Sequence, residues 1–215
     1  MTLFRLDASI RTHGSASREI ADIVEAEWLD RHPGDVVERR HIGVDVLPPD
    51  RWAAAVAGGM TPAEERTAEQ RAGLALAATL MDELVAADAI LFAVPLYNYG
   101  VSAHFKMYVD LVLADPRATG KNFLAGKPVV LATARGGAYG TGTPREGWDH
   151  STPYLRRIIA DCWGADLTVV EREFTLVGVN PALDSFADQA AQMHVEALHA
   201  AREAGRALGA LPVSA

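Results

Sequence analysis

Short apolar runs along the chain alternate with longer stretches whose apolar residues recur at helical spacing. The runs at 89–94 (AILFAV) and 128–134 (PVVLATA) are almost entirely apolar, as expected for strands buried on both faces of a parallel sheet. Residues 2–6, 35–41 and 167–172 have the length and composition of further strands. The pattern therefore predicts five strands.

Five helices are predicted between and after these strands. The first begins after Ser15 or Ser17, each of which has a hydroxyl that can cap a helix N-terminus. The other four are expected at 65–86, 102–113, about 150–163 and 183–208. Strands that alternate with helices, without a repeat or a linker, predict a single α/β domain over residues 1–215. Its expected fold is flavodoxin-like: a doubly wound parallel sheet of five strands in the order 2-1-3-4-5, with helices on both faces.

Three segments between the predicted helices and strands are expected to consist mostly of loop. The segment 43–65 contains several prolines and the Gly58-Gly59 pair, so we expect a long surface excursion with one helical turn. Residues 95–101 and the glycine-rich segment 135–147 are expected to be loops at the ends of strands.

Composition narrows the class of protein. The chain has 215 residues, 49% of them hydrophobic, and a formal net charge of -8, which argues against binding to nucleic acid phosphates. No apolar run approaches the roughly 18–20 residues of a membrane span, and the first residues lack a signal-peptide pattern, so we expect a cytoplasmic protein. The single Cys162 excludes an internal disulfide and is expected to be a small, buried apolar residue. The seven histidines show no metal-ligand spacing, so we expect no metal site.

Ligands of open parallel sheets bind beyond the carboxyl ends of the strands, where strands 1 and 3 diverge. The loop after strand 1 carries hydroxyls at Ser9, Ser15 and Ser17 and a glycine at Gly14, directly before a helix N-terminus. Such a loop can hold a phosphomonoester through hydroxyls, backbone N–H groups and the helix dipole. It has neither a dinucleotide-binding fingerprint nor a P-loop. A polar loop that only caps the helix is an equally good interpretation.

Two further loops meet at the same edge of the predicted sheet. In the loop after strand 3, Tyr97 and Tyr99 bracket Asn98 and can enclose a planar heterocycle; the alternative is a turn whose aromatics only pack. In the loop after strand 4, the consecutive Gly136 and Gly137 allow the backbone to approach a ligand closely, and a flexible surface turn is the alternative.

The motifs in these loops resemble those of a known family. They are S-I-x-x-x-G-S-x-S at 9–17, P-L-Y-N-Y at 95–99, F-K-x-Y-x-D at 105–110, A-R-G-G-x-Y at 134–139 and T-P-Y-L at 152–155. The chain resembles the FMN-dependent NADH:quinone oxidoreductases known as azoreductases, within the flavodoxin-like superfamily. The resemblance extends over nearly the whole chain, and the combination of the second and fourth motifs is specific.

The resemblance implies a cofactor site for FMN. The phosphate would be held by Ser9, Ser15, Ala16 and Ser17. The isoalloxazine would be lined by Pro95, Leu96, Tyr97, Asn98 and Tyr99 on one edge, and by Ala134, Arg135, Gly136, Gly137 and Tyr139 on the other. Tyr99, Tyr139 and Phe123 are the candidates for the substrate pocket, and no residue is singled out as a catalyst.

The implied activity is an NAD(P)H oxidoreductase that reduces quinones, azo compounds or nitro aromatics by ping-pong hydride transfer through flavin N5. The segment 114–123, which roofs the flavin in relatives, is short here, so a dedicated biosynthetic reductase for one aromatic or N–N-bonded compound is an alternative. A flavodoxin-like electron carrier and a flavin-free regulator are alternatives from other classes. The sequence does not distinguish NADH from NADPH.

The family resemblance also implies a homodimer, and the segment 43–65 with Trp52 and Met60 is apolar enough to form the contact or to cover its own domain. Lys106 and Asp110 lie one helical turn apart and are expected to form a structural ion pair. The two histidines nearest the predicted site, at positions 13 and 150, are expected to be solvated loop residues.

Overall fold

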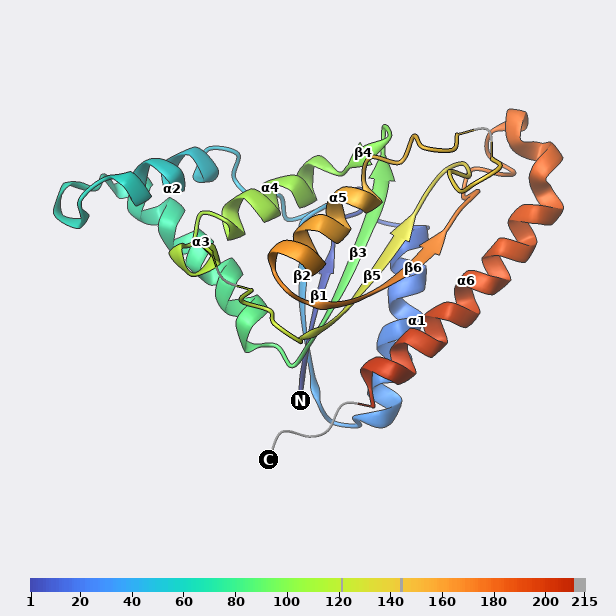
Figure 1. Ribbon diagram of the computed structural model, residues 1–215, viewed down its shortest axis with the longest axis horizontal. Coiled ribbons are helices and arrows are strands. Elements are labelled where there is room, and N and C mark those ends of the chain that lie inside the picture. The colour runs from blue at the N-terminus through green and yellow to red at the C-terminus, as the bar shows by residue number, and fades with distance from the viewer. Residues whose placement is uncertain (121, 144, 211–215) are drawn as a thin grey trace.

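Five parallel strands form the centre of the protein in the computed structural model, which describes residues 1–120, 122–143 and 145–210 (Figure 1). The strands, in chain order, are β1 (Thr2–Asp7), β2 (Val36–His41), β3 (Ala89–Tyr97), β5 (Pro128–Ala134) and β6 (Asp166–Arg172). Their order across the sheet is β2-β1-β3-β5-β6. This confirms the predicted flavodoxin-like order. Lys121 and Pro144, which fall in the predicted segments 114–123 and 135–147, lie outside the described residues.

The burial of each strand follows from its place in the sheet. The central strand β3 is buried at eight of its nine positions, and β5 at six of seven, because helices cover both faces. The edge strands β2 and β6 instead consist mostly of exposed and half-buried positions. The two continuous apolar runs in the sequence thus mark the middle of the sheet.

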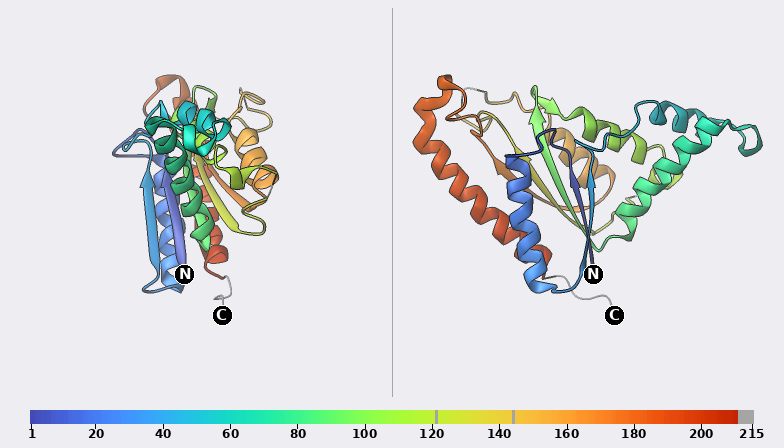
Figure 2. Two further views of the ribbon diagram at one scale, coloured as in Figure 1. Left: turned by 90° about the vertical axis from the view of Figure 1, so that its left-hand side faces the viewer. Right: turned by 180° about the vertical axis from the view of Figure 1, so that it is seen from behind.

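Two helical layers enclose the sheet (Figure 2). The helices α1 (Ala16–Arg31) and α6 (Ala187–Leu208) cover one face, where Trp28 and Val24 of α1 pack with alanines of α6. The other face is covered by α3 (Ala68–Ala86), α4 (Ala103–Val112) and α5 (Thr152–Arg156), the last continued by a π-helical segment at Arg157–Cys162. Short 3-10 turns lie at Pro116–Ala118 and Pro181–Phe186. Each layer therefore has its own apolar core.

The segment 43–65 differs from its prediction. It contains a full helix, α2 (Arg51–Met60), followed by a 3-10 turn at Ala63–Glu65, in place of one helical turn. Gly58 does not break α2, because it lies where α2 approaches α3: a Cβ atom there would lie 3.0 Å from Leu74 Cδ1. From the opposite helix, a Cβ atom at Gly73 would lie 2.6 Å from the backbone nitrogen of Ala55. These glycines permit close helix packing rather than a turn. The α2 end of the pair projects away from the sheet (Figure 1).

The loop predicted at 95–101 also contains more structure than expected. Strand β3 extends to Tyr97 and pairs antiparallel with a short strand, β4 (Gly100–Val101). Only Asn98 and Tyr99 connect the two strands, with φ angles of 49° and 68°. A two-residue connection with both φ angles positive is typical of a type I′ hairpin turn. A backbone turn of this kind places both side chains at the carboxyl edge of the sheet.

Several smaller predictions can be assessed in the structure. The expected ion pair is confirmed, with 2.5 Å between Lys106 Nζ and Asp110 Oδ1. The prediction for Cys162 is wrong: the thiol is exposed, because the inward face of its helical segment is taken by Ile159 and Trp163. Among the described helices, none is long and apolar enough to cross a membrane. The described residues include no cluster of His, Cys, Asp and Glu side chains that could hold a metal ion.

Candidate functional site

A cavity of about 1020 Å³ opens at the carboxyl edge of the sheet, between the loops that follow β1, β3 and β5. This is the switch point at which ligands of open α/β sheets bind. The volume is at the upper end of the roughly 300–1,000 Å³ typical of small-molecule sites. Twelve of the residues predicted from the sequence line the cavity: Ser9, Ser15, Ala16, Ser17, Pro95, Leu96, Tyr97, Asn98, Tyr99, Ala134, Gly136 and Tyr139.

One end of the cavity is the N-terminus of α1. Ser15 is the N-cap of this helix, and its Oγ accepts a hydrogen bond from the N–H of Arg18 at 3.4 Å and lies 3.3 Å from Ser17 Oγ. The first N–H groups of a helix have no intrahelical acceptor, and the helix dipole is positive here. Gly14 has a φ of 63° and open space where a Cβ atom would be. The loop therefore caps the helix and leaves open space beside its N-terminus, and we call it the cradle loop.

The hydroxyl of Ser9 is used to hold this loop against β3. Ser9 Oγ lies 3.2 Å from Tyr97 Oη, and the N–H of Ile10 donates to the same phenol oxygen at 3.2 Å. From the other side, Gly43 lies against Ser9 so closely that a Cβ atom at position 43 would be 2.1 Å from the Ser9 carbonyl oxygen. Ser9 is 1% exposed. The cradle is thus fixed from two directions.

Charged residues that the sequence reasoning missed surround this end. Arg18 Nη1 lies 2.6 Å from His41 Nε2, and its Nη2 donates to the carbonyl of Arg11 at 2.5 Å. Arg172, from the end of β6, forms an ion pair with Glu19 of α1. Helical spacing from Ser15 could have identified Arg18 and Glu19, because both lie in the first turn of α1. Arg172 lies far from them in the sequence and has no comparable signal.

The opposite end of the cavity is aromatic. The Tyr99 ring lies 6.4 Å from the Tyr139 ring and 5.5 Å from the Trp148 ring, both edge to face. The guanidinium of Arg145 lies over Tyr99 and Tyr139. A left-handed conformation costs a non-glycine residue roughly 1–2 kcal/mol. At Tyr99 these ring contacts help to offset that cost, as does the hydrogen bond from the N–H of His150 to the Tyr99 carbonyl at 2.9 Å.

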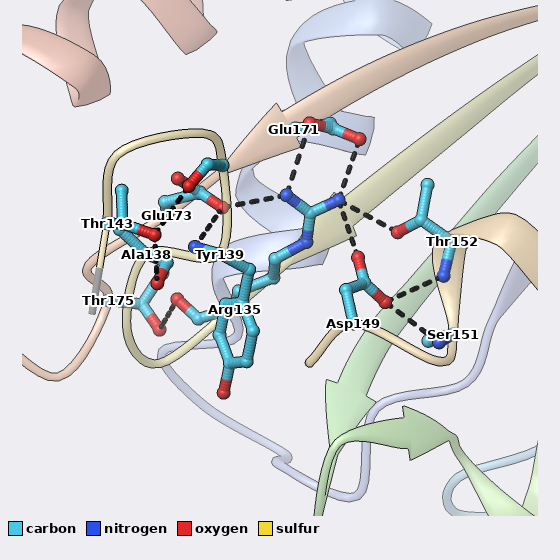
Figure 3. A network of polar contacts seen from close by, with 11 residues as sticks. Arg135, Ala138, Tyr139, Thr143, Asp149, Ser151, Thr152, Glu171, Glu173 and Thr175 are labelled. Atoms are coloured by element: carbon cyan, nitrogen blue, oxygen red, sulfur yellow. Dashed lines mark hydrogen bonds and ion pairs between the residues drawn. The ribbon is translucent and has the colours of Figure 1, made fainter. Parts of the chain in front are cut away.

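The structure places Arg135 differently from its prediction. Its guanidinium is buried and contacts three carboxylates: Glu171 at 2.7 Å, Glu173 at 2.8 Å and Asp149 at 2.9 Å (Figure 3). It also donates to Thr152 Oγ1 at 2.8 Å. Because these partners lie behind the loop, the side chain does not line the cavity. We call this group of five residues the Arg135 hub.

The Arg135 hub holds the glycine-rich loop in position. Glu173 Oε1 also accepts the N–H of Tyr139 at 2.9 Å, and Asp149 Oδ1 accepts the N–H groups at the start of α5 (Figure 3). Burial by itself lowers the pKa of Arg135, but its hydrogen bonds and charge contacts with Glu171, Glu173 and Asp149 outweigh burial, so the pKa is raised. The guanidinium remains charged and connects three separate segments of the chain.

The glycines of this loop pair with the segment that follows β6. The carbonyls of Gly136 and Gly137 accept the N–H groups of Leu176 and Phe174 at 3.1 Å. Leu176 and its neighbour Thr175 consequently line the cavity, although the sequence reasoning missed both. Gly137 itself is buried and lies behind the lining.

Phe123 does not reach the cavity, so its expected place in the substrate pocket is wrong. Its ring lies 5.4 Å from that of Trp163 and packs against the apolar core. The physical reason is chain direction: the segment precedes β5, so it lies at the amino ends of the strands, opposite the site. The histidines at positions 13 and 150 are both exposed, as predicted.

Comparisons with known proteins agree with this geometry. A family model described as "Flavodoxin-like fold" matches residues 1–202. A curated FMN-dependent NADH:quinone oxidoreductase of Frankia casuarinae is 39% identical over 204 residues, covering 93% of this chain and 96% of the relative. Another, from Streptomyces coelicolor, is 34% identical over 211 residues, or 94% of each chain.

Solved structures are similar in fold. The crystal structure of an FMN-dependent NADH-azoreductase from Bacillus anthracis in complex with FMN has a TM-score of 0.79 at 17% identity, covering 97% of this chain and 100% of that one. At this level of identity the likeness concerns the fold alone.

Proposed function

This chain belongs to the family of FMN-dependent NADH:quinone oxidoreductases with the flavodoxin-like fold, and we propose that it binds FMN in the cavity and uses NADH or NADPH to reduce quinones or azo aromatic compounds. The observation that carries the proposal is the two-ended cavity: a helix N-terminus with hydroxyls at one end and a strained aromatic hairpin at the other, at the switch point of the sheet.

At the α1 end, the residues fit a phosphate group. Ser15, Ser17 and the first N–H groups of α1 would donate hydrogen bonds to phosphate oxygens, and the helix dipole favours the negative charge. Ala16 would contribute through its backbone. Arg11 and Arg18 add positive charge beside the same loop. Ser9 acts mainly by fixing the shape of the loop through Tyr97.

At the aromatic end, the residues fit a planar heterocycle. Residues 95–99 and Tyr139 would enclose a ring system. Within the described chain, the N–H group of Gly136 makes no hydrogen bond, so it is available to a polar ring edge. Arg135 supports this edge from behind through the hub. When bound, FMN supplies the two-electron redox chemistry.

The order of events that we propose is ping-pong. NADH and then the acceptor would occupy the same space beside Tyr99 and Tyr139, which contribute shape and stacking. We assign no general acid or base to the site, and protons would come from solvent at the cavity mouth.

We also propose that the protein is a homodimer. Apolar side chains are exposed along the projecting α2 helix and the preceding loop, with Trp52 43%, Val46 54% and Met60 78% exposed. A patch of this kind is typical of a contact between subunits. A dimer mass in light scattering at micromolar concentration is the expected result, and a monomer would contradict the proposal.

The decisive experiment for the activity is an absorbance spectrum of the protein after FMN loading and desalting, followed by anaerobic addition of NADH. We expect flavin bands that are retained and then bleached within seconds. Loss of the flavin on desalting would contradict the proposal. Retained bands that neither NADH nor NADPH bleaches would indicate an electron carrier instead. A panel of quinones and azo compounds then distinguishes a broad reductase from a dedicated one.

A further inference from the structure

Arg145 has an unusual position among the charged residues of the cavity. It lines the aromatic end, with its guanidinium carbon 5.6 Å from the centre of the Tyr99 ring and 5.9 Å from that of Tyr139. Its Nη1 lies 3.2 Å from Tyr139 Oη. The two rings therefore hold the guanidinium at the aromatic end of the cavity.

Several of the other charged residues along the cavity wall have partners within the protein. Arg172 is paired with Glu19, and Arg18 contacts His41 and a carbonyl. Asp22 pairs with Arg5 at 2.7 Å. Like Arg11 and Arg18 at the α1 end, Arg145 has no carboxylate within ion-pair distance among the described residues. What sets Arg145 apart is its place: at the aromatic end of the cavity it is a positive charge with no acidic partner.

The guanidinium also retains most of its hydrogen-bonding capacity. Arginine has five N–H donors in a planar arrangement that suits carboxylate, sulfonate and phosphate groups. Within the described part of the chain, Arg145 uses one donor, toward Tyr139 Oη. Stacking against the Tyr99 and Tyr139 rings limits its motion, so less entropy is lost when a ligand binds.

We propose that Arg145 is a specificity-determining residue that binds an anionic group on the reactant entering beside Tyr99 and Tyr139. The site thus selects acidic aromatic acceptors, such as sulfonated or carboxylated quinones, over neutral ones. The same chemistry occurs in the phosphates of the nicotinamide dinucleotide, which are the other source of an anion. This inference rests on the proposed function, because it concerns the second reactant of the FMN-loaded protein.

The test begins with equilibrium binding to the FMN-loaded protein. The probe is naphthalene-2-sulfonate, which is not reduced, and its neutral match is naphthalene-2-sulfonamide; both are titrated by calorimetry. We expect Arg145→Gln to weaken sulfonate binding roughly fivefold or more and to leave sulfonamide binding unchanged. Arg145→Lys keeps the charge and should retain most of the preference. Equal affinity of the wild-type protein for the two probes would overturn the proposal.

Two matched variants separate charge from ring packing. Arg157→Gln removes an exposed arginine outside the cavity, paired with Asp161 at 2.8 Å, and should leave both affinities unchanged. Tyr139→Phe removes the one hydrogen bond to Arg145 but keeps the charge, so the sulfonate preference should persist. Loss of the preference in Arg157→Gln, or an unchanged preference in Arg145→Gln, would overturn the proposal.

Steady-state kinetics then identify the source of the anion. If the acceptor carries it, Arg145→Gln raises KM for a sulfonated naphthoquinone severalfold without raising KM for unsubstituted naphthoquinone or for NADH. If only KM for NADH rises, the group bound is a dinucleotide phosphate, and selection of acidic acceptors is overturned. Retained FMN and bleaching by NADH in the wild-type protein and in Arg157→Gln separate failure of this inference from failure of the proposed function.

Discussion

The two ends of the cavity are constructed in opposite ways. At the α1 end, the cap, the hydroxyls and the open glycine all lie between residues 9 and 18, and a single helix N-terminus positions them. At the aromatic end, the lining comes from four separate segments, which meet through the Arg135 hub and the Tyr99 hairpin. Groups held within one short segment contribute small, independent amounts to stability. Where distant segments meet, the contribution of each group to stability depends on the others.

The same difference applies to the energetics of the two ends. At the α1 end, the N-cap satisfies one backbone N–H group and stabilises the helix by about 1 kcal/mol. The other N–H groups of the first turn remain for a ligand. The aromatic end combines a left-handed tyrosine with one buried guanidinium among three carboxylates. Strained or buried charged groups persist where the surrounding structure over-determines them. We therefore expect the aromatic end to respond more strongly to single substitutions.

The largest expected effect is at the hub. Arg135→Gln leaves Glu171, Glu173 and Asp149 without their common partner, two of them largely buried. Removing one partner of a buried ion pair costs about 3–5 kcal/mol. The free energy of unfolding from guanidinium chloride denaturation should fall by this amount. The surface variant Arg157→Gln should change it by less than about 1 kcal/mol. A similarly small loss of stability in Arg135→Gln would show that the aromatic end depends on contacts between distant segments no more than the α1 end does.

A smaller effect is expected at the helix cap. Ser15→Ala should lower the free energy of unfolding by about 1 kcal/mol and also weaken FMN binding. Ser15→Asp sharpens the test, because aspartate caps a helix as well as serine does but places a negative charge in the cradle. This variant should retain stability and lose FMN affinity in fluorescence titrations. Parallel changes in both quantities would mean that Ser15 is only a cap.

At the Tyr99 hairpin, the sign of the stability difference between two variants is the test. Tyr99→Ala and Tyr99→Gly both remove the ring, but only glycine adopts the left-handed conformation without strain. The glycine variant should be the more stable of the two by up to about 1 kcal/mol in thermal or chemical unfolding. At Ala26, exposed in the middle of α1, the same exchange should cost about 1 kcal/mol instead. A glycine variant at position 99 that is less stable than alanine would show that Tyr99 stores no strain.

The smallest effect is expected away from both ends. Lys106→Gln breaks the ion pair with Asp110 on the surface of α4 and should cost about 0.3–0.5 kcal/mol. A double-mutant cycle with Asp110→Asn measures this coupling. FMN affinity should not change, which provides the baseline for the other variants. A change in affinity would extend the functional region beyond the cavity.

The predictability of the molecule follows the same division between local and distant contacts. Strand order and half of the residues that line the cavity could be predicted, because apolar runs, caps and strand-end loops are local patterns. The α2 helix was missed because glycine is read as a helix breaker, whereas Gly58 and Gly73 serve close packing. Cys162 was misplaced because the burial of one position depends on which face of its helix meets the sheet.

The errors at the site have the same origin. Arg135 belongs to a recognisable motif, but its direction is determined by carboxylates 14 to 38 residues away in the chain. Phe123 was assigned by its type and its position in a short segment, and chain direction places it at the other edge of the sheet. Arg145 and Leu176 have no local signal. Motifs identified which loops meet, and only the structure shows which side chains of those loops face inward.

The close contact between Gly43 and the Ser9 carbonyl has a consequence for variation of the sequence. Position 43 lies on the turn after β2 and lines no part of the cavity, yet the space for even a methyl group is already occupied by the cradle loop. In a saturation library selected for flavin retention, position 43 should accept glycine only. Exposed His13, on the cradle loop itself, should tolerate many residues. Mutational tolerance in this protein would then report backbone crowding as faithfully as contact with the ligand.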